Sequence, residues 1–408
     1  MTHPCVDAYD PLDPAVLADP HPWYAELRRR APVHHLPARG LWLVARHDDV
    51  VGVLRRPELF SSAAMAAAVT RPRQFTPEQD AGWVEAEGIS IVGTDGARHA
   101  RLRGVLNRGF TPGRIAALAP RVGALARQLA EPWLDAGACE FLADFAAPFP
   151  TMVIAELLGI DPERRAGFKR WADAALLGVF ESLGAEQQQQ VGARLVEMSD
   201  YFDTVIEARR QRPGDDLVSA LVRAEGEDSA LTPTEVKVFV FTLLVAGSAT
   251  STHLLANAMH ALVRHPEARA AVAACPERVP ALVEEVLRWD GPVQMLLRTA
   301  TEDVEVAGVR IRRGETVAPL FASANHDERI FPDPDRFDVA RRPREHLAFG
   351  HGIHFCLGAA LARLEARAAF EWLLPRMGQP VLEEEPVPWL PSLVFRGPTR
   401  LRLRFVRA

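Results

Sequence analysis

The strongest constraint on the fold is a long helical pattern over residues 233–265. Thr232 can cap this helix, a proline occupies its first position, and Glu235 follows three residues after the cap, which is a typical helix start. The next proline is Pro266, so the helix has room for about 33 residues, or roughly 50 Å at 1.5 Å per residue. Because residues 238–246 are apolar on most sides, this helix is expected to cross the middle of a large domain.

The centre of this helix, residues 246–252, reads Ala-Gly-Ser-Ala-Thr-Ser-Thr. Glycine and hydroxyl residues are poor helix formers, because glycine is flexible and hydroxyl groups compete for backbone hydrogen bonds. The stretch therefore predicts a weak point in the helix. Two interpretations remain open from the residues alone: the small side chains let another helix pack closely, or the weak point serves a function.

A second informative stretch is the glycine-rich loop over residues 349–358, which places Cys356 at the start of an Ala/Leu-rich helix. Unpaired backbone N–H groups and the positive end of the helix dipole stabilise a thiolate at such a position. The glycines of the loop allow tight turns and close approach of the backbone to a flat ligand. Cys356 is therefore a candidate metal ligand or nucleophile.

Two other interpretations of Cys356 are open. A cysteine without paired spacing is often a small buried hydrophobe with no chemical role. A zinc site made of His351, His354 and Cys356 is the other alternative. It is weaker, because a structural zinc site needs four ligands and no Cys-x-x-Cys partner occurs in the chain.

The pattern Phe-x-x-Gly-x-x-x-Cys-x-Gly, formed by Phe349, Gly352, Cys356 and Gly358, resembles the haem-binding loop of the cytochrome P-450 monooxygenases. The resemblance covers nearly the whole chain. It implies haem b held by the thiolate of Cys356, which favours O–O cleavage. It also implies a mainly α fold with small β-sheets (α+β) in a single large haem-containing domain, residues 1–408.

Composition is consistent with a large globular domain: 48% of residues are hydrophobic and 25% are charged. The net charge of −6 gives no indication of nucleic-acid binding. Residues 1–22 contain neither a signal-peptide core nor a membrane-spanning run, and the four cysteines lack paired spacing. We therefore expect a cytoplasmic, monomeric protein without a disulfide framework or a membrane partner.

The same resemblance implies a set of haem contacts. His99 and Arg103 are four residues apart on an expected helix, so they share a face and could clamp two negative groups; a solvated basic helix is the alternative. In the family, a His-x-x-x-Arg in this place contacts the haem propionates. The resemblance also implies that Phe349 shields the ligand loop. The implied haem-contacting residues are His99, Arg103, Arg298, His354, Phe349, Gly350, Ala246 and Gly358.

The resemblance also assigns the helix centre to oxygen activation. Thr250 matches the family threonine that helps deliver protons to oxygen, but the preceding residue is Ala249, where the family usually has Asp or Glu. Ser248, Ser251, Thr252 or ordered water are the possible substitutes. Besides a ferredoxin-supported monooxygenase, the missing acid suggests a peroxide-driven peroxygenase. A non-catalytic haem sensor is a third function that remains open.

A mostly apolar pocket is expected for the substrate, and such a pocket does not identify it. Terpenoids, steroids, fatty acids and polyketide-like compounds all remain open. The irregular stretch 61–92 resembles the loop that covers this pocket. The expected pocket residues are Ile89, Ile91, Val92, Leu176, Leu177, Phe180, Thr242, Val245, Val293, Gln294, Leu296, Val394 and Phe395.

An ion pair is expected before the cysteine loop. Glu285 and Arg288 lie three apart on one helical face and resemble the family's core pair, which Arg336 would complete. The alternative is a surface pair between Glu284 and Arg288, worth about 0.2–0.5 kcal/mol. If the cluster is buried, removing one partner would cost about 3–5 kcal/mol.

Electrons must come from another protein, because the chain has no Gly-x-Gly-x-x-Gly nucleotide-binding motif. The resemblance implies a ferredoxin and its reductase, with O2 and a hydrophobic small molecule as substrates. A basic patch that steers an acidic ferredoxin is one interpretation of the arginines, and a scattered solvated surface is the other. The arginines concerned are Arg98, Arg101, Arg108, Arg114, Arg341, Arg342, Arg344 and Arg363.

The peripheral elements follow from periodicity. Residues 304–306 and 309–311 alternate around Ala-Gly and predict a hairpin. Leu401, Leu403 and Phe405 alternate as a final strand, which we expect to pair with residues 393–395. Residues 115–134 are expected to form one continuous helix.

Overall fold

The structure is a computed structural model that describes residues 5–65, 90–180, 184–223 and 231–408, except for the side chains of residues 178–180. The chain forms two compact units. Unit 1 contains Met1–Ser61, Ala126–Ala147 and Thr250–Ala408, and unit 2 contains Ser62–Leu125 and Pro148–Ala249. Each unit is therefore built from chain segments that are distant in sequence.

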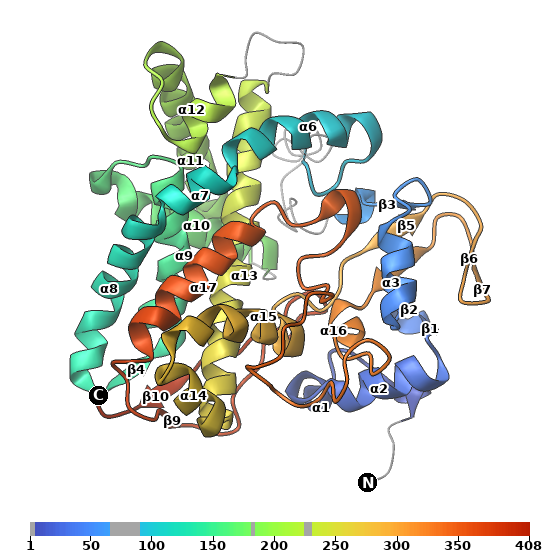
Figure 1. Cartoon of the computed structure of the whole chain (residues 1–408). Helices are drawn as coiled ribbons and strands as arrows, with labels where there is room; N and C mark the ends of the chain where they lie inside the picture. The colour runs from blue at the N-terminus through green and yellow to red at the C-terminus, as the bar shows by residue number, and fades with distance from the viewer. Residues whose placement is uncertain (1–4, 66–89, 181–183, 224–230) are drawn as a thin grey trace. The chain divides into compact units, whose positions relative to one another are not determined.

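Unit 1 contains all the described strands and many short helices (Figure 1). Its strands are β1 (Val33–Leu36), β2 (Leu41–Val44), β3 (Phe60–Ser61), β4 (Ala138–Glu140), β5 (Arg298–Ala300), β6 (Val304–Val306), β7 (Val309–Ile311), β8 (Thr316–Pro319), β9 (Val381–Leu382) and β10 (Arg402–Arg404). Its α-helices are α1 (Pro14–Ala18), α2 (His21–Arg30), α3 (His47–Leu54), α14 (Pro266–Ala273), α15 (Val279–Asp290), α16 (Phe321–Ala324) and α17 (Ala359–Leu373). Shorter helical turns are η1 (Val6–Ala8), η2 (Pro37–Arg39), η3 (Leu142–Ala146), η5 (Pro276–Arg278) and η6 (Gly352–His354).

The main sheet of unit 1 has five strands in the order β1-β2-β8-β5-β3. Strands β2 and β8 are parallel, and the other neighbours are antiparallel. Leu43 and Val44 of β2 are completely buried on opposite faces of the sheet, because successive side chains of a strand alternate. Val44 belongs to an apolar cluster with residues of α3, and Leu43 belongs to a second cluster with residues of α2. The sheet thus gives unit 1 a hydrophobic core of its own.

The predicted hairpin is confirmed as β6 and β7, which pair with Val306 opposite Val309. Ala307 and Gly308 both have positive φ angles, of 48° and 80°. A two-residue hairpin turn with two positive φ angles matches the twist of the flanking strands.

The predicted partner of the last strand is wrong. Strand β10 pairs with β4 and β9 in a three-stranded sheet, with Leu403 opposite Cys139. Phe395 instead forms an isolated bridge with Val293. Alternation identifies which side chains of a strand are buried, but it does not identify the neighbouring strand.

Unit 2 consists of helices in the described part of the chain: α6 (Gly96–Gly109), α7 (Pro112–Ala117), α9 (Pro148–Leu157), η4 (Pro162–Arg164), α10 (Arg165–Phe180), α11 (Ala185–Gln211) and α12 (Leu217–Val222). Two further helices, α8 (Ala119–Ala136) and α13 (Pro233–Arg264), have residues in both units. The single helix expected over residues 115–134 is in fact α7 followed by α8. Thr111 caps the short α7 by accepting a hydrogen bond from the Arg114 backbone N–H.

Helix α13 confirms the long helix that the sequence predicts over residues 233–265. The Thr232 hydroxyl accepts from the Glu235 backbone N–H, and the Glu235 carboxylate accepts from the Thr232 backbone N–H, which completes a capping box. Among the described residues it is the one helix long and apolar enough to span a membrane, but 78% of its most apolar stretch is buried inside the protein. That burial is what a core helix requires.

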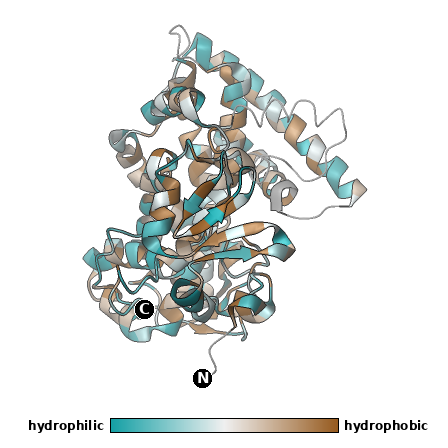
Figure 2. Cartoon of the chain, turned by 90° about the vertical axis from the view of Figure 1, so that its right-hand side faces the viewer, coloured by the Kyte–Doolittle hydropathy of each residue, from teal (hydrophilic) through white to brown (hydrophobic). Residues whose placement is uncertain are grey.

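The hydropathy of the residues also supports elements that are buried on their apolar side. Apolar and polar stretches alternate along the helices and strands in Figure 2. In unit 1, Val44 of β2 and Val317 of β8 belong to one buried cluster with α3, while Leu43 and Ala318 belong to a second cluster with α2. Amphipathic elements of this kind obtain most of their stability from tertiary packing.

Candidate active site

The cysteine loop of unit 1 is a tight turn that ends at the first residues of α17. The Cys356 backbone N–H donates to the Phe349 carbonyl at 2.9 Å, and the Phe355 N–H donates to Gly352 at 3.1 Å. Gly350 and Gly352 have φ angles of +70° and +73°. At Gly352 a Cβ atom would lie 2.6 Å from the Leu54 carbonyl oxygen, so glycine is required there on two grounds.

The thiol of Cys356 lies beside the start of α17, for which Gly358 is the N-cap residue. A Cβ atom on Gly358 would lie 3.9 Å from the Cys356 sulfur, which shows how closely the backbone passes the thiol. The unpaired N–H groups and dipole of a helix start favour the thiolate over the thiol. The loop therefore presents a soft anionic donor in a short, fixed turn.

The zinc alternative fails within the described residues. They contain no group of three or more His, Cys, Asp or Glu side chains placed to hold a metal ion. His351, which the zinc alternative requires, instead accepts a hydrogen bond at Nε2 from Arg55 Nε at 2.9 Å. The cysteine loop is thus not a multidentate metal site made of protein side chains.

The other cysteines differ from Cys356 in setting. Cys139 is buried in β4, and burial raises the pKa of its thiol far above the ordinary value. Cys275 donates to the Glu277 carboxylate at 3.2 Å, and Cys5 is exposed. No disulfide joins any two of the four cysteines, all of which lie among the described residues. The expected absence of a disulfide framework fits this arrangement.

Helix α15 places the predicted ion pair in the interior of unit 1. The Glu285 and Arg288 side chains are both 0% exposed and are joined by hydrogen bonds of 2.7 and 2.9 Å. Arg288 also donates to the backbone carbonyls of Asn325, Pro334 and Arg336. The pair is therefore a buried structural link, and not the surface pair with Glu284.

The third member of this cluster is not the side chain of Arg336. That side chain is exposed, and Arg336 contributes its backbone carbonyl instead. Arg341 takes the predicted place, with its Nε 3.4 Å from Glu285 Oε1 and its side chain 15% exposed. The sequence pattern identified the right loop but could not give the direction in which each arginine points.

Glu284, the preceding residue, makes a separate cluster. Arg363 of α17 donates to both of its carboxylate oxygens at 2.6 and 2.9 Å, and His346 lies 3.0 Å from it. Burial favours the neutral acid, but the hydrogen bonds from Arg363 and His346 outweigh it and hold the pKa of Glu284 at about 2. The carboxylate is therefore charged at every pH at which the protein is expected to work.

The expected haem clamps are distributed over both units. In unit 1, Arg298 lies on β5 and is 4% exposed, and His354 lies in η6 two residues before Cys356. In unit 2, His99 and Arg103 lie on α6, with His99 3% exposed. Arg103 also donates to Asn107 at 3.1 Å. All four side chains are thus positioned on regular or tightly turned backbone.

The centre of α13 remains α-helical across residues 246–252. In unit 2, a Cβ atom on Gly247 would lie 3.0 Å from Ile154 Cδ1, so the glycine permits close packing against α9. Ser248 is 1% exposed and accepts from the Thr151 hydroxyl at 3.4 Å. The packing interpretation of the small residues therefore holds at Gly247, while Ala249 and Thr250 remain partly exposed.

Sequence reasoning missed Glu365, a buried acid on α17. Its side chain is 2% exposed, and within unit 1 it lies within hydrogen-bonding reach of Ser251 of α13. Burial raises the pKa of Glu365 to about 8, although the Ser251 hydrogen bond opposes this shift. The signal was present in the sequence, because Glu365 follows buried Leu361 by four residues on the apolar face of its helix.

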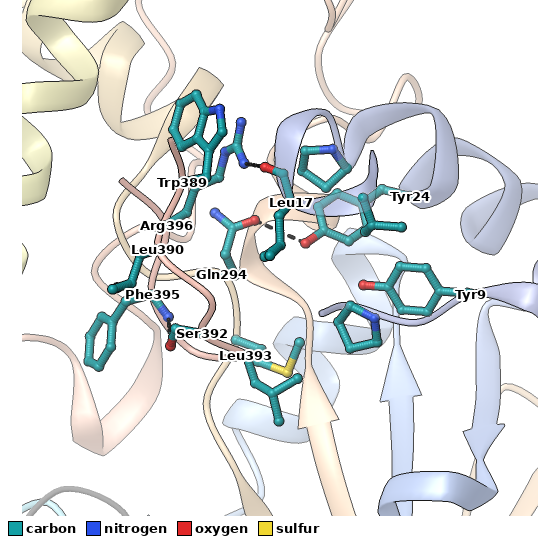
Figure 3. A pocket seen from close by; sticks show the side chains of 14 residues that line it. Tyr9, Leu17, Tyr24, Gln294, Trp389, Leu390, Ser392, Leu393, Phe395 and Arg396 are labelled. Carbon is teal, nitrogen blue, oxygen red and sulfur yellow. Dashed lines mark hydrogen bonds between the residues drawn. The ribbon is translucent and has the colours of Figure 1, made fainter. Parts of the chain in front are cut away.

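Several expected pocket residues lie side by side in unit 1. The Gln294 backbone N–H donates to the Val394 carbonyl at 2.8 Å, and Val293 bridges to Phe395. The Gln294 side chain is 5% exposed; it accepts from the Tyr24 hydroxyl and donates to the Gly291 carbonyl. Figure 3 shows it directed toward Tyr24, beside a small hollow lined by residues from the N-terminal segment and from 389–396.

The other residues predicted to line the pocket differ in how deeply they are buried. Thr242 and Val245 of α13 are 4% and 1% exposed, and the Thr242 hydroxyl donates to the Val238 carbonyl. The half-buried residues are Ile91, Val92, Leu176, Leu177 and Leu296. Ile89 and the side chain of Phe180 lie outside the described residues, as does most of the covering loop expected at 61–92.

Similarity to known proteins agrees with this geometry. Residues 174–274 and 278–394 match the family model described as cytochrome P-450. The chain is 39% identical over 399 residues to cytochrome P-450 monooxygenase PikC of Streptomyces venezuelae, covering 96% of this chain and 92% of that protein. The chain belongs to the cytochrome P-450 family.

Solved P-450 structures confirm the expected fold class. Cytochrome P-450 CYP109Q5 from Chondromyces apiculatus has a TM-score of 0.88 and 40% identity, covering 99% of this chain and all of that chain. CYP109E1 from Bacillus megaterium in complex with testosterone has a TM-score of 0.84 and 33% identity, covering 95% of this chain and 99% of that chain. The mainly helical P-450 fold with small sheets is thus confirmed.

Membership assigns the class of enzyme and its cofactor. The chain is a P-450 monooxygenase, an oxidoreductase, and proteins of this family bind haem b through a cysteine thiolate. The residues present fit that group, because the glycine-rich turn holds a cysteine at a helix start and leaves its sulfur close to bare backbone. The expected cofactor, haem b, therefore agrees with both the family and the geometry.

Proposed function

We propose that Cys356 is the axial haem ligand of this P-450 and that the enzyme inserts one atom of O2 into a hydrophobic small molecule, by hydroxylation or epoxidation. The observation that carries the proposal is the turn at residues 349–358, in which the Cys356 N–H is tied to Phe349 and the sulfur lies at the start of α17. Haem bound there would supply the oxygen-activating chemistry, and the protein residues have other roles.

The first role is to hold the cofactor. In unit 1, Arg298 and His354 supply cationic or hydrogen-bonding groups for haem carboxylates, and in unit 2 His99 and Arg103 have the same role. Charge-assisted hydrogen bonds to carboxylates are about twice as strong as neutral ones. Phe349 covers the loop, while Gly350, Gly358 and Ala246 leave space for a flat group.

The second role is to supply protons. Ala249 has no acidic group, but within unit 1 the Glu365 carboxyl lies within reach of the Ser251 hydroxyl, next to Thr250. With a pKa of about 8, Glu365 is mostly protonated at neutral pH and can donate a proton. We propose that Glu365 and Ser251 replace the missing acid and that Thr250 positions the proton, with ordered water between them where needed.

The third role is to select the substrate. A steroid is supported by the similarity to CYP109E1, which was solved in complex with testosterone. Terpenoids, fatty acids and polyketide-like compounds are equally compatible with a mostly apolar pocket. A panel of these four classes should be tested by the shift of the haem absorption band on binding, followed by product analysis of each compound that binds.

Electron supply requires a partner, and we propose a ferredoxin with its reductase in the cytoplasm. In unit 1, Arg342 and Arg344 are exposed, and in unit 2, Arg98 and Arg108 are exposed. Among the other predicted patch residues, Arg101 pairs with Glu235 and Arg363 pairs with Glu284. We therefore propose that Arg342 and Arg344 are the steering charges of unit 1.

Salt dependence tests this patch. Lower ionic strength should accelerate reduction by a ferredoxin, because screening of exposed charges weakens. The double variant Arg342→Gln, Arg344→Gln should lose most of that dependence. A reduction rate that is the same at low and high salt in the unmodified enzyme would refute the steering patch.

Variants of two cysteines and of Thr250 test the central proposal. The reduced, carbon-monoxide-treated protein should show the absorption band typical of a thiolate ligand, and Cys356→Ala should lack it. Cys139→Ala, which removes the buried cysteine of β4, should retain the band. Thr250→Ala should keep the haem but release a larger share of its electrons as peroxide; unchanged coupling would remove Thr250 from proton delivery.

A peroxide-driven reaction is the second candidate, and Ala249 is the observation that favours it. Turnover with hydrogen peroxide needs less proton delivery than turnover with O2. If the peroxide reaction is faster than the ferredoxin-supported one, the peroxygenase is the better description. Ala249→Asp should then shift the balance toward the ferredoxin-supported reaction.

A further inference from the structure

Glu284, Arg363 and His346 form a polar cluster that no part of the proposed mechanism uses. All three belong to unit 1: Glu284 lies on α15, Arg363 on α17, and His346 just before the cysteine loop. Arg363 binds both oxygens of Glu284, at 2.6 and 2.9 Å, and His346 Nε2 lies 3.0 Å from Oε2. The Glu284 and Arg363 side chains are 29% and 33% exposed, and His346 is 4% exposed.

The hydrogen bonds define the ionic part of this cluster. Arg363 donates to both oxygens of the Glu284 carboxylate. The Ala348 backbone N–H donates to His346 Nδ1 at 3.3 Å, which helps to hold the ring beside Glu284. The Glu284–Arg363 pair therefore contains one negative and one positive charge.

The cluster is connected to the cysteine loop through an aromatic ring. The Arg363 guanidinium lies over the Phe349 ring, 4.4 Å from its centroid, which is a cation–π contact. The Phe349 carbonyl in turn accepts the hydrogen bond from the Cys356 backbone N–H at 2.9 Å. One side of the loop is therefore in contact with a positive charge whose counter-charge is Glu284.

We propose that Glu284 and Arg363 act as a charge-balanced pair beside the cysteine loop, in which each residue cancels the effect of the other's charge on the reduction potential of the haem. This inference rests on the proposed assignment of Cys356 as the haem ligand. Reduction of the haem adds one negative charge, so a nearby cation favours the reduced form and a nearby anion opposes it. In the intact pair these two effects largely cancel, while the bidentate hydrogen bonds keep Arg363 on the face of Phe349. Both residues are positioning residues and neither reacts.

Opposite shifts in the two single variants are the signature of this pair. Arg363→Gln leaves the Glu284 charge uncompensated, so the ratio of reduced to oxidised haem at a fixed applied potential should fall about four- to fifteenfold. Glu284→Gln leaves Arg363 uncompensated and should raise the same ratio by a similar factor. These factors assume one unit charge on the order of 10 Å away and an effective dielectric constant of about 20–40.

The double variant Glu284→Gln, Arg363→Gln should return the ratio to within about twofold of the unmodified protein, because both charges are absent. Arg363→Lys retains the charge and should also stay close to the unmodified protein. The control is Arg367→Gln, one turn further along α17, where Arg367 pairs with Glu371 on the surface at 3.3 Å. The ratio of reduced to oxidised haem should not change in Arg367→Gln.

Spectroelectrochemical titration of the haem-loaded protein measures all five variants. General damage to the loop would shift both single variants in the same direction, and that outcome would overturn the proposal. So would an unshifted ratio in the single variants, or a shift in Arg363→Lys equal to that in Arg363→Gln. The carbon-monoxide band of each variant is recorded separately, so loss of the thiolate ligand is distinguished from a change of potential.

Discussion

Two adjacent glutamates on α15 show how one helix turn serves two purposes. Glu285 is 0% exposed and bonds to Arg288 inside unit 1, whereas Glu284 is 29% exposed and bonds to Arg363 beside the cysteine loop. Neighbouring helical positions point about 100° apart, so the two carboxylates meet different surroundings. Neighbours in sequence can therefore differ completely in what their charges do.

The buried partner is also the more completely bonded one. Arg288 has five N–H donors, and each has a partner: two bonds go to Glu285 and three to backbone carbonyls. Arg363 makes two bonds to Glu284 and a contact with a ring. We therefore expect the Glu285 cluster to control stability and the Glu284 cluster to control the electrostatics of the loop.

The largest expected effect is on the free energy of unfolding, when the buried Glu285 cluster is disrupted. Arg288→Ala leaves the Glu285 carboxylate buried next to unpaired carbonyls and should lower the free energy of unfolding by about 3–5 kcal/mol. Chemical denaturation of the haem-loaded protein measures it. Arg336→Ala is the matched control, because that side chain is exposed, and it should cost less than about 0.5 kcal/mol. Equal losses in the two variants would reverse the comparison.

A second test uses Glu365, which is buried like Glu285 but has no cationic partner within the described part of the chain. Its pKa of about 8 in the folded protein lies above the ordinary value of 4.5, so unfolding releases its proton between these pH values. Stability should therefore fall as pH rises from about 4.5 to 8, by roughly 3–5 kcal/mol in total. Glu365→Gln should remove that decline in denaturation curves measured across the range; parallel curves would show that Glu365 is ionised in the folded protein.

Glu284 should show the opposite dependence. Its pKa of about 2 lies below the ordinary value of 4.5, so its contribution is present above pH 4.5 and is lost as pH falls toward 2. Allowing for its partial exposure, we expect Glu284→Gln to cost about 1–2 kcal/mol at pH 7 and nothing near pH 2. The difference between the two proteins, followed by acid titration of unfolding, is the measurement. A constant difference at all pH values would mean that lost packing is the cause.

The smallest effect should come from a pair on the same helix as Arg363. Arg367 and Glu371 lie one turn apart on α17 and are 49% and 42% exposed. Arg367→Ala should change the free energy of unfolding by about 0.2–0.5 kcal/mol at low salt and by less at high salt. A loss above about 1 kcal/mol would show that surface pairs on this helix are stronger than the comparison assumes.

Prediction from sequence succeeded where the reason is local. The capping box of α13 involves residues three apart, and the hairpin turn depends on two consecutive residues with positive φ angles. It failed where several partners were equally plausible. Arg341 and Arg336 are both arginines near the end of the same loop, and only the folded backbone decides which one faces Glu285.

In the candidate site, too, local features were predicted from the sequence and long-range contacts were not. The motif around Cys356 resembles the haem-binding loop of the P-450 family, and the matching family model and solved structures confirm the family and its cofactor. The contact between Glu365 and Ser251 joins residues more than 100 positions apart in the chain, so no local pattern could have predicted it. The hydrogen bonds that hold Arg363 over Phe349 are also long-range in sequence, because Glu284 comes from another helix.

The sequence by itself determined the long central helix, the turn that carries Cys356 and the family to which the chain belongs. Short-range preferences were sufficient for these features, because helix capping, glycine conformation and motif spacing act over a few residues. Only the tertiary structure decided which acids are buried and which cations they meet. Those choices depend on desolvation and on contacts between distant segments, and both exist only after the chain has folded.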